Sequence, residues 1–389
     1  MSILIVVLLV IVVALVFDFT NGFHDTANAM ATSVATGALA PRVAVLISAV
    51  LNLVGAFLST AVAKTVSSGI LTESSKGIPH ISTTMIFAGL VGAVLWNLGT
   101  WWLGLPSSST HALFGGLIGA AIIGTGFDAV NFGGVVSKIL LPALLSPVIA
   151  GSVALVATYL AYRITKLATV RGSESGFRHA QTVSASLVSL AHGTNDAQKT
   201  MGVITLTLIV AGYQNANTGP QIWVIIACGL AIALGTYSGG WRIIRTVGKR
   251  ITDIQPPQGF GAETSAASTI LISSSLGFPL STTQVTSGAV VGAGLGKKLA
   301  SVHWGIVGRI AIAWVVTLPA AALVGGLATW LATANVLGFI VVIVLGVAGA
   351  LTFVLLARRK PVTHETVNDE HDSGSAPAEP ATSSSGRAR

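Results

Sequence analysis

The sequence carries little charge and almost no cysteine for its length. Only 9% of its 389 residues are Asp, Glu, Lys or Arg, whereas a soluble globular protein has about a quarter. The single cysteine, Cys228, lies in an apolar run and excludes an internal disulfide or a cysteine-based metal cluster. Aromatic residues amount to only 6%. These absences argue against a soluble domain and against a disulfide-stabilised fold.

Long apolar runs are abundant instead. The chain is 52% hydrophobic, its mean hydropathy is +0.80, and repeated apolar stretches have the length of about 20 residues that spans a bilayer. Its 44 glycines, with many Ser and Thr in the runs, indicate close helix packing. We predict an all-α polytopic membrane protein with about 10–12 membrane segments. The span-sized segments are 2–31, 42–63, 81–103, 106–127, 133–162, 181–212, 220–238, 262–276, 279–296, 303–331 and 336–357.

Residues 1–17 could be mistaken for a secretion signal. They lack a basic start and a small-residue cleavage site, so we interpret them as a retained span.

The net charge of +8 does not indicate nucleic-acid binding, because the basic residues gather in short loops between apolar runs. Cytoplasmic loops of membrane proteins have this character. The clusters are Arg163, Lys166, Arg171, Arg178; Arg242, Arg245, Lys249, Arg250; Lys297, Lys298; and Arg358, Arg359, Lys360. We expect a cytoplasmic C-terminus and, because the tail is acidic and rich in Ser, Pro and Ala, a disordered tail.

Two pairs of motifs reveal an internal repeat. GFHDTANAM at 22–30 aligns with GTNDAQKTM at 193–201, and PSSSTHALFGGLIGA at 106–120 aligns with PLSTTQVTSGAVVGA at 279–293. The motifs keep their order and nearly their spacing in both halves. The predicted organisation is an N-terminal repeat at 1–162, a cytoplasmic linker at 163–180, a C-terminal repeat at 181–357 and a tail at 358–389.

The repeat is predicted to be inverted in the membrane. An even number of segments separates the two Asp motifs, so the motif segments run in opposite directions. Inverted repeats are typical of secondary transporters, whose sites form near the midplane where the halves meet. Because NGFHDTAN and LAHGTNDAQKT interrupt apolar runs, we expect broken helices at 21–28 and 190–200. The P-x-S/T segments are expected in paired re-entrant or short helical hairpins.

Pro106 and Pro279 each precede a run of hydroxyls. A proline followed by Ser or Thr marks a helix start, whose free N–H groups form an anion site. Hydroxyl donors that rotate suit a tetrahedral oxyanion. The alternative is that these side chains bond their own backbone, but two matched tracts favour the anion site. Its predicted hydroxyls are Ser108, Ser109, Thr110, Ser281, Thr282 and Thr283.

Asp25 and Asp196 are the candidate cation ligands or proton carriers. A carboxylate at the centre of a membrane helix costs at least about 2.5–3.5 kcal/mol and usually marks an ion pathway. The alternative is a buried hydrogen bond that ties off a broken helix. Asp18 lies two helical turns before Asp25 and is either part of the site or a polar packing group.

Other polar residues exchange places between the repeats. His24 and Asn21 in the first motif correspond to Asn195 and His192 in the second. The histidines could relay protons or act as neutral hydrogen-bonding groups. His111 matches Gln284, so hydrogen bonding is their shared property.

Lys199 matches Asn28. Its ammonium either supplies a fixed positive charge to the anion site or snorkels away from it.

The four motifs resemble those of the PiT family of inorganic phosphate transporters, over about residues 1–357. The resemblance is to the short bacterial type. It implies a secondary symporter with an inverted repeat, no enzymatic activity and no resident cofactor, in which a transport domain moves against a scaffold in the bacterial plasma membrane. Family members are often dimers, so a homodimer is an expectation. The resemblance implies that the hydroxyls, with Asn28 and Lys199, hold phosphate beside Asp25 and Asp196.

The sequence departs from the family signature at two positions. His24 replaces an Asn, and Lys199 replaces another, which weakens a symmetric sodium arrangement. We therefore favour coupling to H⁺, with Na⁺ as the alternative. Transport of phosphate as a divalent-metal complex and transport of sulfate also stay open. A passive channel is a further alternative, but an inverted repeat suits alternating access better than a fixed pore. An intramembrane hydrolase is a remote alternative, because a nucleophile needs one base in reach rather than two equivalent hydroxyl runs.

Overall fold

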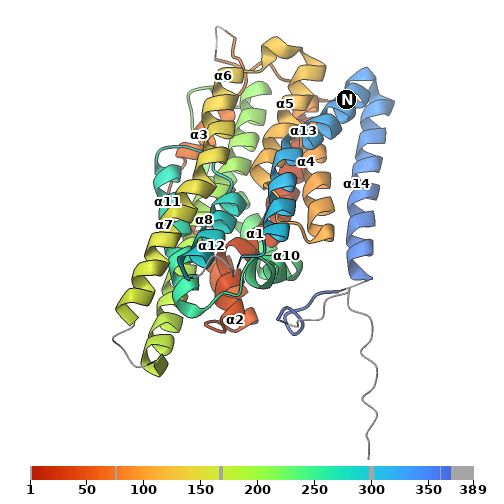
Figure 1. Ribbon diagram of the computed structural model, residues 1–389. Coiled ribbons are helices and arrows are strands. Elements are labelled where there is room, and N and C mark those ends of the chain that lie inside the picture. The colour runs from red at the N-terminus through yellow and green to blue at the C-terminus, as the bar shows by residue number, and fades with distance from the viewer. Residues whose placement is uncertain (1, 75–76, 166–169, 298–301, 360, 369–389) are drawn as a thin grey trace, which may run out of the picture.

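The described residues form a bundle of helices (Figure 1). The computed structural model describes residues 2–74, 77–165, 170–297, 302–359 and 361–368. In the N-terminal half the helices are α1 (Ile3–Ala35), α2 (Pro41–Gly55), α3 (Ala61–Ser68), α4 (Thr83–Leu103), α5 (Ser109–Gly124), α6 (Phe132–Val135) and α7 (Leu141–Thr165). A π-helical turn, Val136–Leu140, joins α6 to α7.

The C-terminal half begins with the longest helix that the structure describes, α8 (Val170–Val210). It is followed by α9 (Ile222–Ser238), α10 (Trp241–Arg245) with the π-helical turn η3 (Thr246–Arg250), α11 (Pro256–Ser275), α12 (Thr282–Lys297), α13 (Trp304–Ala334) and α14 (Val336–Arg358). The predicted span-sized segments coincide with helices except for 42–63, in which α2 ends at Gly55 and α3 begins at Ala61. The short helix α10 had not been predicted.

Several helices in the described residues are long and apolar enough to cross a bilayer. They are α1, α4, the α6–α7 segment, α13 and α14. α9 and the α10–η3 segment are apolar enough when taken together, but the chain bends by 61° between them. α14 stands at the edge of the bundle, packed on α13 and α4 (Figure 1). The composition and these helices identify a multi-pass membrane protein.

The helix breaks predicted at 21–28 and 190–200 are wrong. α1 and α8 continue through both motifs without interruption. No proline removes a backbone hydrogen bond there, and the polar side chains point into the protein, where partners are available. The chain instead breaks at the proline–hydroxyl segments, where Gly104 (φ 66°) and Gly277 (φ 78°) follow the ends of α4 and α11.

The helix contacts repeat between the halves. α4 and α5 form one helical hairpin and α11 and α12 form another. α1 packs on α4, as α8 packs on α11, while α5 packs on α13 and α12 packs on α7. These matched contacts agree with the duplication read from the sequence; the inversion of the two repeats across the membrane stays a prediction.

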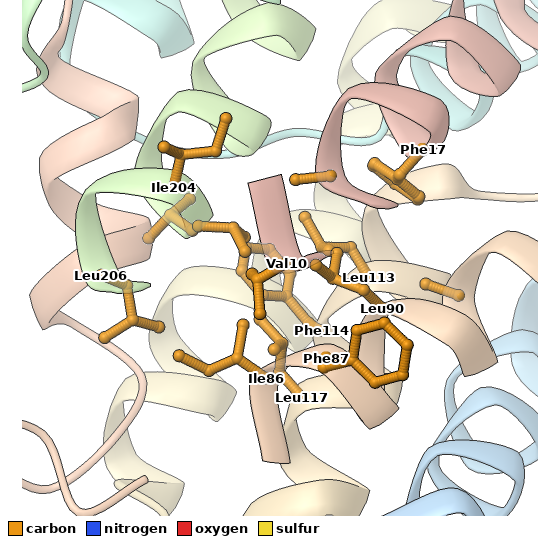
Figure 2. Packing of buried hydrophobic residues seen from close by; sticks show 14 of the residues in the cluster. Val10, Phe17, Ile86, Phe87, Leu90, Leu113, Phe114, Leu117, Ile204 and Leu206 are labelled. Atoms are coloured by element: carbon orange, nitrogen blue, oxygen red, sulfur yellow. The ribbon is translucent and has the colours of Figure 1, made fainter. Parts of the chain in front are cut away.

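An apolar cluster fixes the α4–α5 hairpin. It joins side chains of α1, α4, α5 and α8 that are almost fully buried: Val10, Phe17, Ile86, Phe87, Leu90, Leu113, Phe114, Leu117, Ile204 and Leu206 (Figure 2). Within a membrane the contacts of such side chains stabilise helix association through close van der Waals packing, so this hairpin is held mainly by apolar packing.

A polar cluster fixes the α11 side. Glu263 of α11 is buried, with 1% of its surface exposed. Its carboxylate accepts hydrogen bonds from Thr32 (2.5 Å), Ser33 (2.6 Å), Gln181 (3.2 Å) and Ser184 (2.5 Å). Those bonds tie α11 to α1 and α8 at once.

The predicted linker and tail are described only in part. α7 reaches Thr165 and α8 begins at Val170, so helix occupies much of the range 163–180. At the start of the tail, residues 361–368 turn back on the body, with Val367 1% exposed and the ring of His364 6.1 Å from that of Trp241. Lys166, Lys298, Lys360 and residues 369–389 lie outside the described residues.

Candidate ion-binding site

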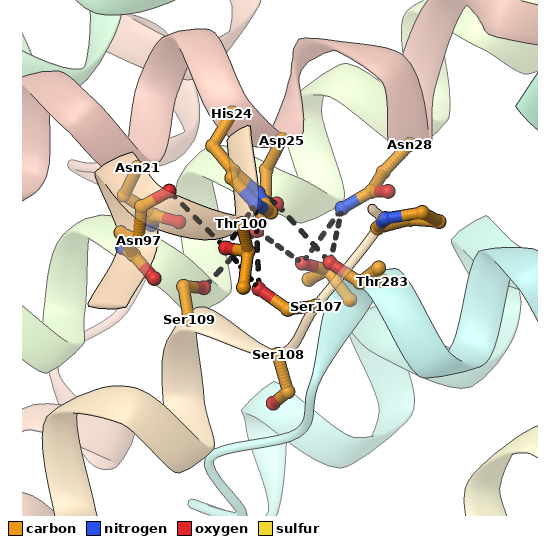
Figure 3. A network of polar contacts seen from close by, with 12 residues as sticks. Asn21, His24, Asp25, Asn28, Asn97, Thr100, Ser107, Ser108, Ser109 and Thr283 are labelled. Carbon is orange, nitrogen blue, oxygen red and sulfur yellow. Dashed lines mark hydrogen bonds and ion pairs between the residues drawn. The ribbon is translucent and has the colours of Figure 1, made fainter. Parts of the chain in front are cut away.

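Two hairpin tips meet the middle of α1 and α8. The tips are the first residues of α5 and α12, and Thr110 of one tip donates to the Leu280 carbonyl of the other at 3.1 Å. Figure 3 shows His24, Asp25 and Asn28 of α1 directed toward Ser107, Ser109 and Thr283. The predicted site residues therefore come from distant parts of the chain into one buried cluster.

The shared glycine of the two motifs permits close helix contact beside the site. A Cβ at Gly22 would meet the backbone of α9 at Ile232, and a Cβ at Gly193 would meet the backbone of α2 at Asn52. These close approaches fix the rotation of α1 and α8, and so the direction in which Asp25 and Asp196 point.

Each hairpin tip begins a helix with a serine cap. The Ser108 hydroxyl accepts a hydrogen bond from the His111 amide (3.1 Å), and the Ser281 hydroxyl accepts one from the Gln284 amide (3.3 Å). The His111 ring and the Gln284 amide meet at 3.5 Å, so these matched residues bridge the tips. Two helix N-termini with their partial positive charge therefore lie next to each other, which favours an anion.

Asp25 is enclosed by hydroxyls and a histidine. Its carboxylate accepts hydrogen bonds from Ser109 and Thr283, each at 3.1 Å, and lies 2.7 Å from Nδ1 of His24. The other ring nitrogen of His24 lies 3.4 Å from both Thr100 and Ser107. His24 thus connects the carboxylate to the α4–α5 turn.

Asp196 has the matching position in the second half. Thr282 donates to its Oδ2 at 3.1 Å and Asn21 donates to the same oxygen at 3.2 Å. Lys199 donates to Oδ1 at 2.6 Å.

His192 lies between the two carboxylates. Its Nε2 is 3.2 Å from Asp196 and 3.9 Å from Asp25. The ligand atoms of these three residues lie within 4.8 Å of one another, an arrangement that could hold a cation. The other nitrogen of His192 contacts Asn52 at 3.1 Å, and Asn52 donates to Thr236 at 2.8 Å.

Asn28 and Lys199 each reach the hairpin tip of the other half. Asn28 donates to Thr283 at 3.0 Å and to Thr282 at 3.3 Å. Lys199 donates to Thr110 at 2.7 Å and to the Leu280 carbonyl at 2.8 Å. With 1% of its surface exposed, Lys199 does not snorkel toward an interface.

Asn195 is the predicted residue that the structure turns away from the carboxylates. Its amide donates to Ser274 at 2.8 Å and to the Phe278 carbonyl at 3.3 Å. It thus fixes the end of α11 against α8. The sequence position next to Asp196 did not indicate this direction, because neighbouring residues of a helix face different sides.

Sequence reasoning missed several members of the cluster. Thr100, Asn52, Thr236 and the Leu280 carbonyl complete its hydrogen bonds. Asn52 and Thr236 are isolated polar residues in apolar segments, which was the signal that could have found them. The Leu280 carbonyl is a backbone group, so the type of residue at this position does not indicate its role.

The chemistry of the cluster follows from its donors. The hydroxyls at both tips donate to carboxylates, so the groups suited to an anion and the groups suited to a cation are bonded to each other. An anion near Asp25 and Asp196 would be repelled while both are ionised. A proton or metal cation on the carboxylates removes that repulsion and releases the hydroxyls.

Comparisons with known proteins show which family the chain resembles. The sequence profile of the phosphate transporter family matches residues 21–325. The chain is 52% identical over 370 residues to a probable low-affinity inorganic phosphate transporter of Mycobacterium tuberculosis (strain ATCC 25618 / H37Rv), covering 94% of this chain and 87% of the relative. It is 43% identical over 329 residues to one of Bacillus subtilis (strain 168), covering 84% and 96%.

A solved structure is also similar. It is described as the sodium-dependent phosphate transporter, with a TM-score of 0.73 and 25% sequence identity, and the match covers 84% of this chain and 98% of that one.

Proposed function

We propose, from the premise that the chain belongs to the phosphate transporter family, that it imports inorganic phosphate together with protons. Its relatives are named as transporters rather than enzymes, which confirms the prediction that it has no enzymatic activity. As a multi-pass protein with bacterial relatives, it lies in the plasma membrane.

One observation carries the symport proposal. The hydroxyls of Ser109, Thr282 and Thr283 donate to Asp25 and Asp196 in a site that is almost fully buried. Phosphate needs those donors, and the carboxylates give them up at least cost when a cation has neutralised them. Binding of the anion and binding of the cation are therefore linked.

The residues have separate roles in this proposal. Phosphate is bound by the hydroxyls of the two tips, by their helix N-termini, and by Asn28 and Lys199. Asp25 and Asp196 carry the coupling charge, and His24 and His192 each lie against a carboxylate as hydrogen-bonding or proton-relaying groups. Asn21 donates to Asp196, and Asn195 positions α8 against the second hairpin.

Lys199 favours protons over sodium. Its ammonium already occupies one oxygen of Asp196 at 2.6 Å, and a sodium ion beside it would face a like charge. The similar solved structure is sodium-dependent by its description, so sodium is the alternative that an experiment must test.

A second candidate cargo is phosphate bound to a divalent metal ion. It is supported by the convergence of Asp25, His192 and Asp196, because an imidazole with two carboxylates suits such an ion. In this version the ion travels with the anion as substrate.

The test is uptake of labelled phosphate into proteoliposomes that contain the purified protein. We expect accumulation when the outside is acidified without sodium, and no stimulation by an imposed sodium gradient. Accumulation that requires sodium would contradict proton coupling. Repeating the assay with a chelator and then with added magnesium tests the metal complex, and competition by sulfate tests selectivity for phosphate.

A further inference from the structure

Asp18 is a buried carboxylate that the site described above does not use. It lies on α1, two turns before Asp25, and its exposed fraction is 0%. Neither of its carboxylate oxygens makes a hydrogen bond to the described residues. An ionised carboxylate in such a place is strongly unfavourable unless it is neutralised. Its environment therefore points to a group that binds a proton or a small cation.

The groups around Asp18 come mainly from α8. The Thr200 hydroxyl faces it from α8, without the geometry of an ordinary hydrogen bond. Asp196, His192 and Lys199 of the same helix are close enough to Asp18 for their charges to act on its carboxylate. Asp18 is thus connected to the central cluster by charge without sharing its hydrogen bonds.

The other helices packed on α1 add little charge near Asp18. From α9, Cys228 interacts with it electrostatically. α4 contains no titratable residue and presents Asn97, whose amide is also without a hydrogen bond to the described residues.

The charged residues of α10 and α11 lie along later turns of α1. Gly240, at the start of α10, lies against Phe23, and Gly248 lies against Ala31. Glu263 bonds Thr32 and Ser33. The charged residue of α2 is Arg42, which lies in the first turn of that helix. Those of α12 are limited to Lys297 at its far end, bonded to Gln255.

The internal repeat shows why this carboxylate is distinctive. When Asp25 is aligned with Asp196, Asp18 matches Ser189, whose hydroxyl only donates to its own helix at 3.0 Å. In the same alignment Asn28 matches Lys199. Within these two aligned segments, the first therefore has one additional negative charge and the second one additional positive charge, and both groups are buried.

We propose that Asp18 is a second proton-carrying site, placed beside the Asp25–Asp196 centre and paired in charge with Lys199. This inference rests on the proposed symport function. When Asp18 is ionised, its charge offsets that of Lys199. When it takes up a proton, its new O–H supplies a donor for the Thr200 oxygen, and the charge of Lys199 is left to attract the phosphate anion. Loss of the proton on the inside restores the balance and weakens phosphate binding.

The test separates coupling from binding in proteoliposomes. Asp18→Asn keeps the shape of the protonated acid but cannot exchange a proton. For this variant we expect phosphate exchange, measured with equal phosphate on both sides and no pH gradient, to stay within about twofold of wild type. Phosphate accumulation driven by a pH gradient should fall at least about tenfold. Asp18→Glu should retain accumulation. Ser189→Ala, at the matching position of the other repeat, is the control and should behave as wild type.

The outcomes distinguish the two proposals. If a pH gradient does not drive phosphate accumulation by the wild-type protein, that result contradicts proton symport itself, and with it the role of Asp18. If wild type responds and Asp18→Asn accumulates phosphate equally well, only the role of Asp18 is overturned. If Asp18→Asn loses both phosphate exchange and phosphate accumulation, the proposed role of Asp18 is also overturned, since the residue then serves folding or phosphate binding. Exchange without accumulation, rescued by Asp18→Glu, is the result expected.

Discussion

Two aligned helical segments contribute an aspartate each to the site but differ in charge. They are residues 18–28 of α1 and residues 189–199 of α8. In each, a hairpin-tip hydroxyl of the same half donates to the aspartate at 3.1 Å: Ser109 to Asp25 and Thr282 to Asp196. A second contact differs between the halves. Thr283 donates directly to Asp25, whereas Lys199 is inserted between Thr110 and Asp196.

This difference in the second contact shows which features the two halves share and which feature each half has alone. Each half keeps a carboxylate, a helix N-terminus and hydroxyl donors, which are the parts needed to bind an anion with a cation. The inserted ammonium makes the second carboxylate a fixed ion pair. The first carboxylate lacks such a partner, so exchange of the coupling cation is expected mainly on the α1 side, where Asp18 also lies.

The largest effect is expected when both carboxylates are neutralised. The double variant Asp25→Asn, Asp196→Asn should lose concentrative phosphate uptake by about 100-fold or more, because an amide side chain cannot take up and release the coupling proton. Uptake into proteoliposomes measures the loss, and gel filtration checks that the variant remains folded. Normal accumulation by a folded double variant would contradict the coupling role.

A single variant at Lys199 makes the two segments alike. Lys199→Asn should lower phosphate uptake by about tenfold or more, because three hydrogen bonds from a buried ammonium are lost. It should also leave one oxygen of Asp196 accessible to a metal cation. We therefore expect uptake by this variant to become stimulated by sodium at constant pH.

The control for this variant is Asn28→Asp, which adds charge in the other half. If Lys199→Asn retains uptake and shows no sodium response, the ammonium is not what excludes sodium.

The two tip threonines test whether the halves bind phosphate equally. Thr110→Val and Thr283→Val each remove one donor and should weaken phosphate binding by about tenfold, the equivalent of about 1.4 kcal/mol. The Thr110 variant should be the weaker binder, since Thr110 accepts a hydrogen bond from the charged Lys199, whereas Thr283 accepts one from the neutral Asn28 amide. Equilibrium binding of labelled phosphate to the purified protein gives both affinities. Wild-type affinity in both variants would show that the hydroxyls do not hold the anion.

The smallest difference is expected at the two serine caps. Ser108→Ala and Ser281→Ala each remove a helix cap worth about 1 kcal/mol, so both should lower the unfolding temperature by a few degrees and to a similar extent. Thermal unfolding of the detergent-solubilised protein measures this. A much larger loss for one variant would mean that the two hairpins depend differently on their tips.

Much of this comparison could be predicted from the sequence. Apolar length placed the helices, and the paired motifs predicted which polar residues would meet. The continuity of α1 and α8 could not be predicted, because it depends on partners such as Thr282 and Thr283, about 250 residues away from Asp25 along the chain. Polarity in an apolar run signals a buried site, and whether the helix breaks there is decided by tertiary hydrogen bonds.

The sequence also did not predict that the two hairpins are held by different kinds of contact, one polar and one apolar. Glu263 and Leu90 occupy matching positions of α11 and α4 when Thr283 is aligned with Thr110. Only the structure shows that Glu263 collects four donors from α1 and α8 while Leu90 lies in an apolar cluster. The donors Thr32 and Ser184 carry no motif, so their convergence becomes visible only after folding.

The central claim, that phosphate and the carboxylates compete for the same hydroxyls, is tested most directly by counting protons during binding. Phosphate is titrated calorimetrically into the sodium-free protein, in buffers with different heats of ionisation, at a pH where free phosphate is already the monoanion. The account predicts net uptake of at least about one proton per phosphate bound, and reciprocal strengthening of binding by acid. Phosphate binding that takes up no protons would contradict it.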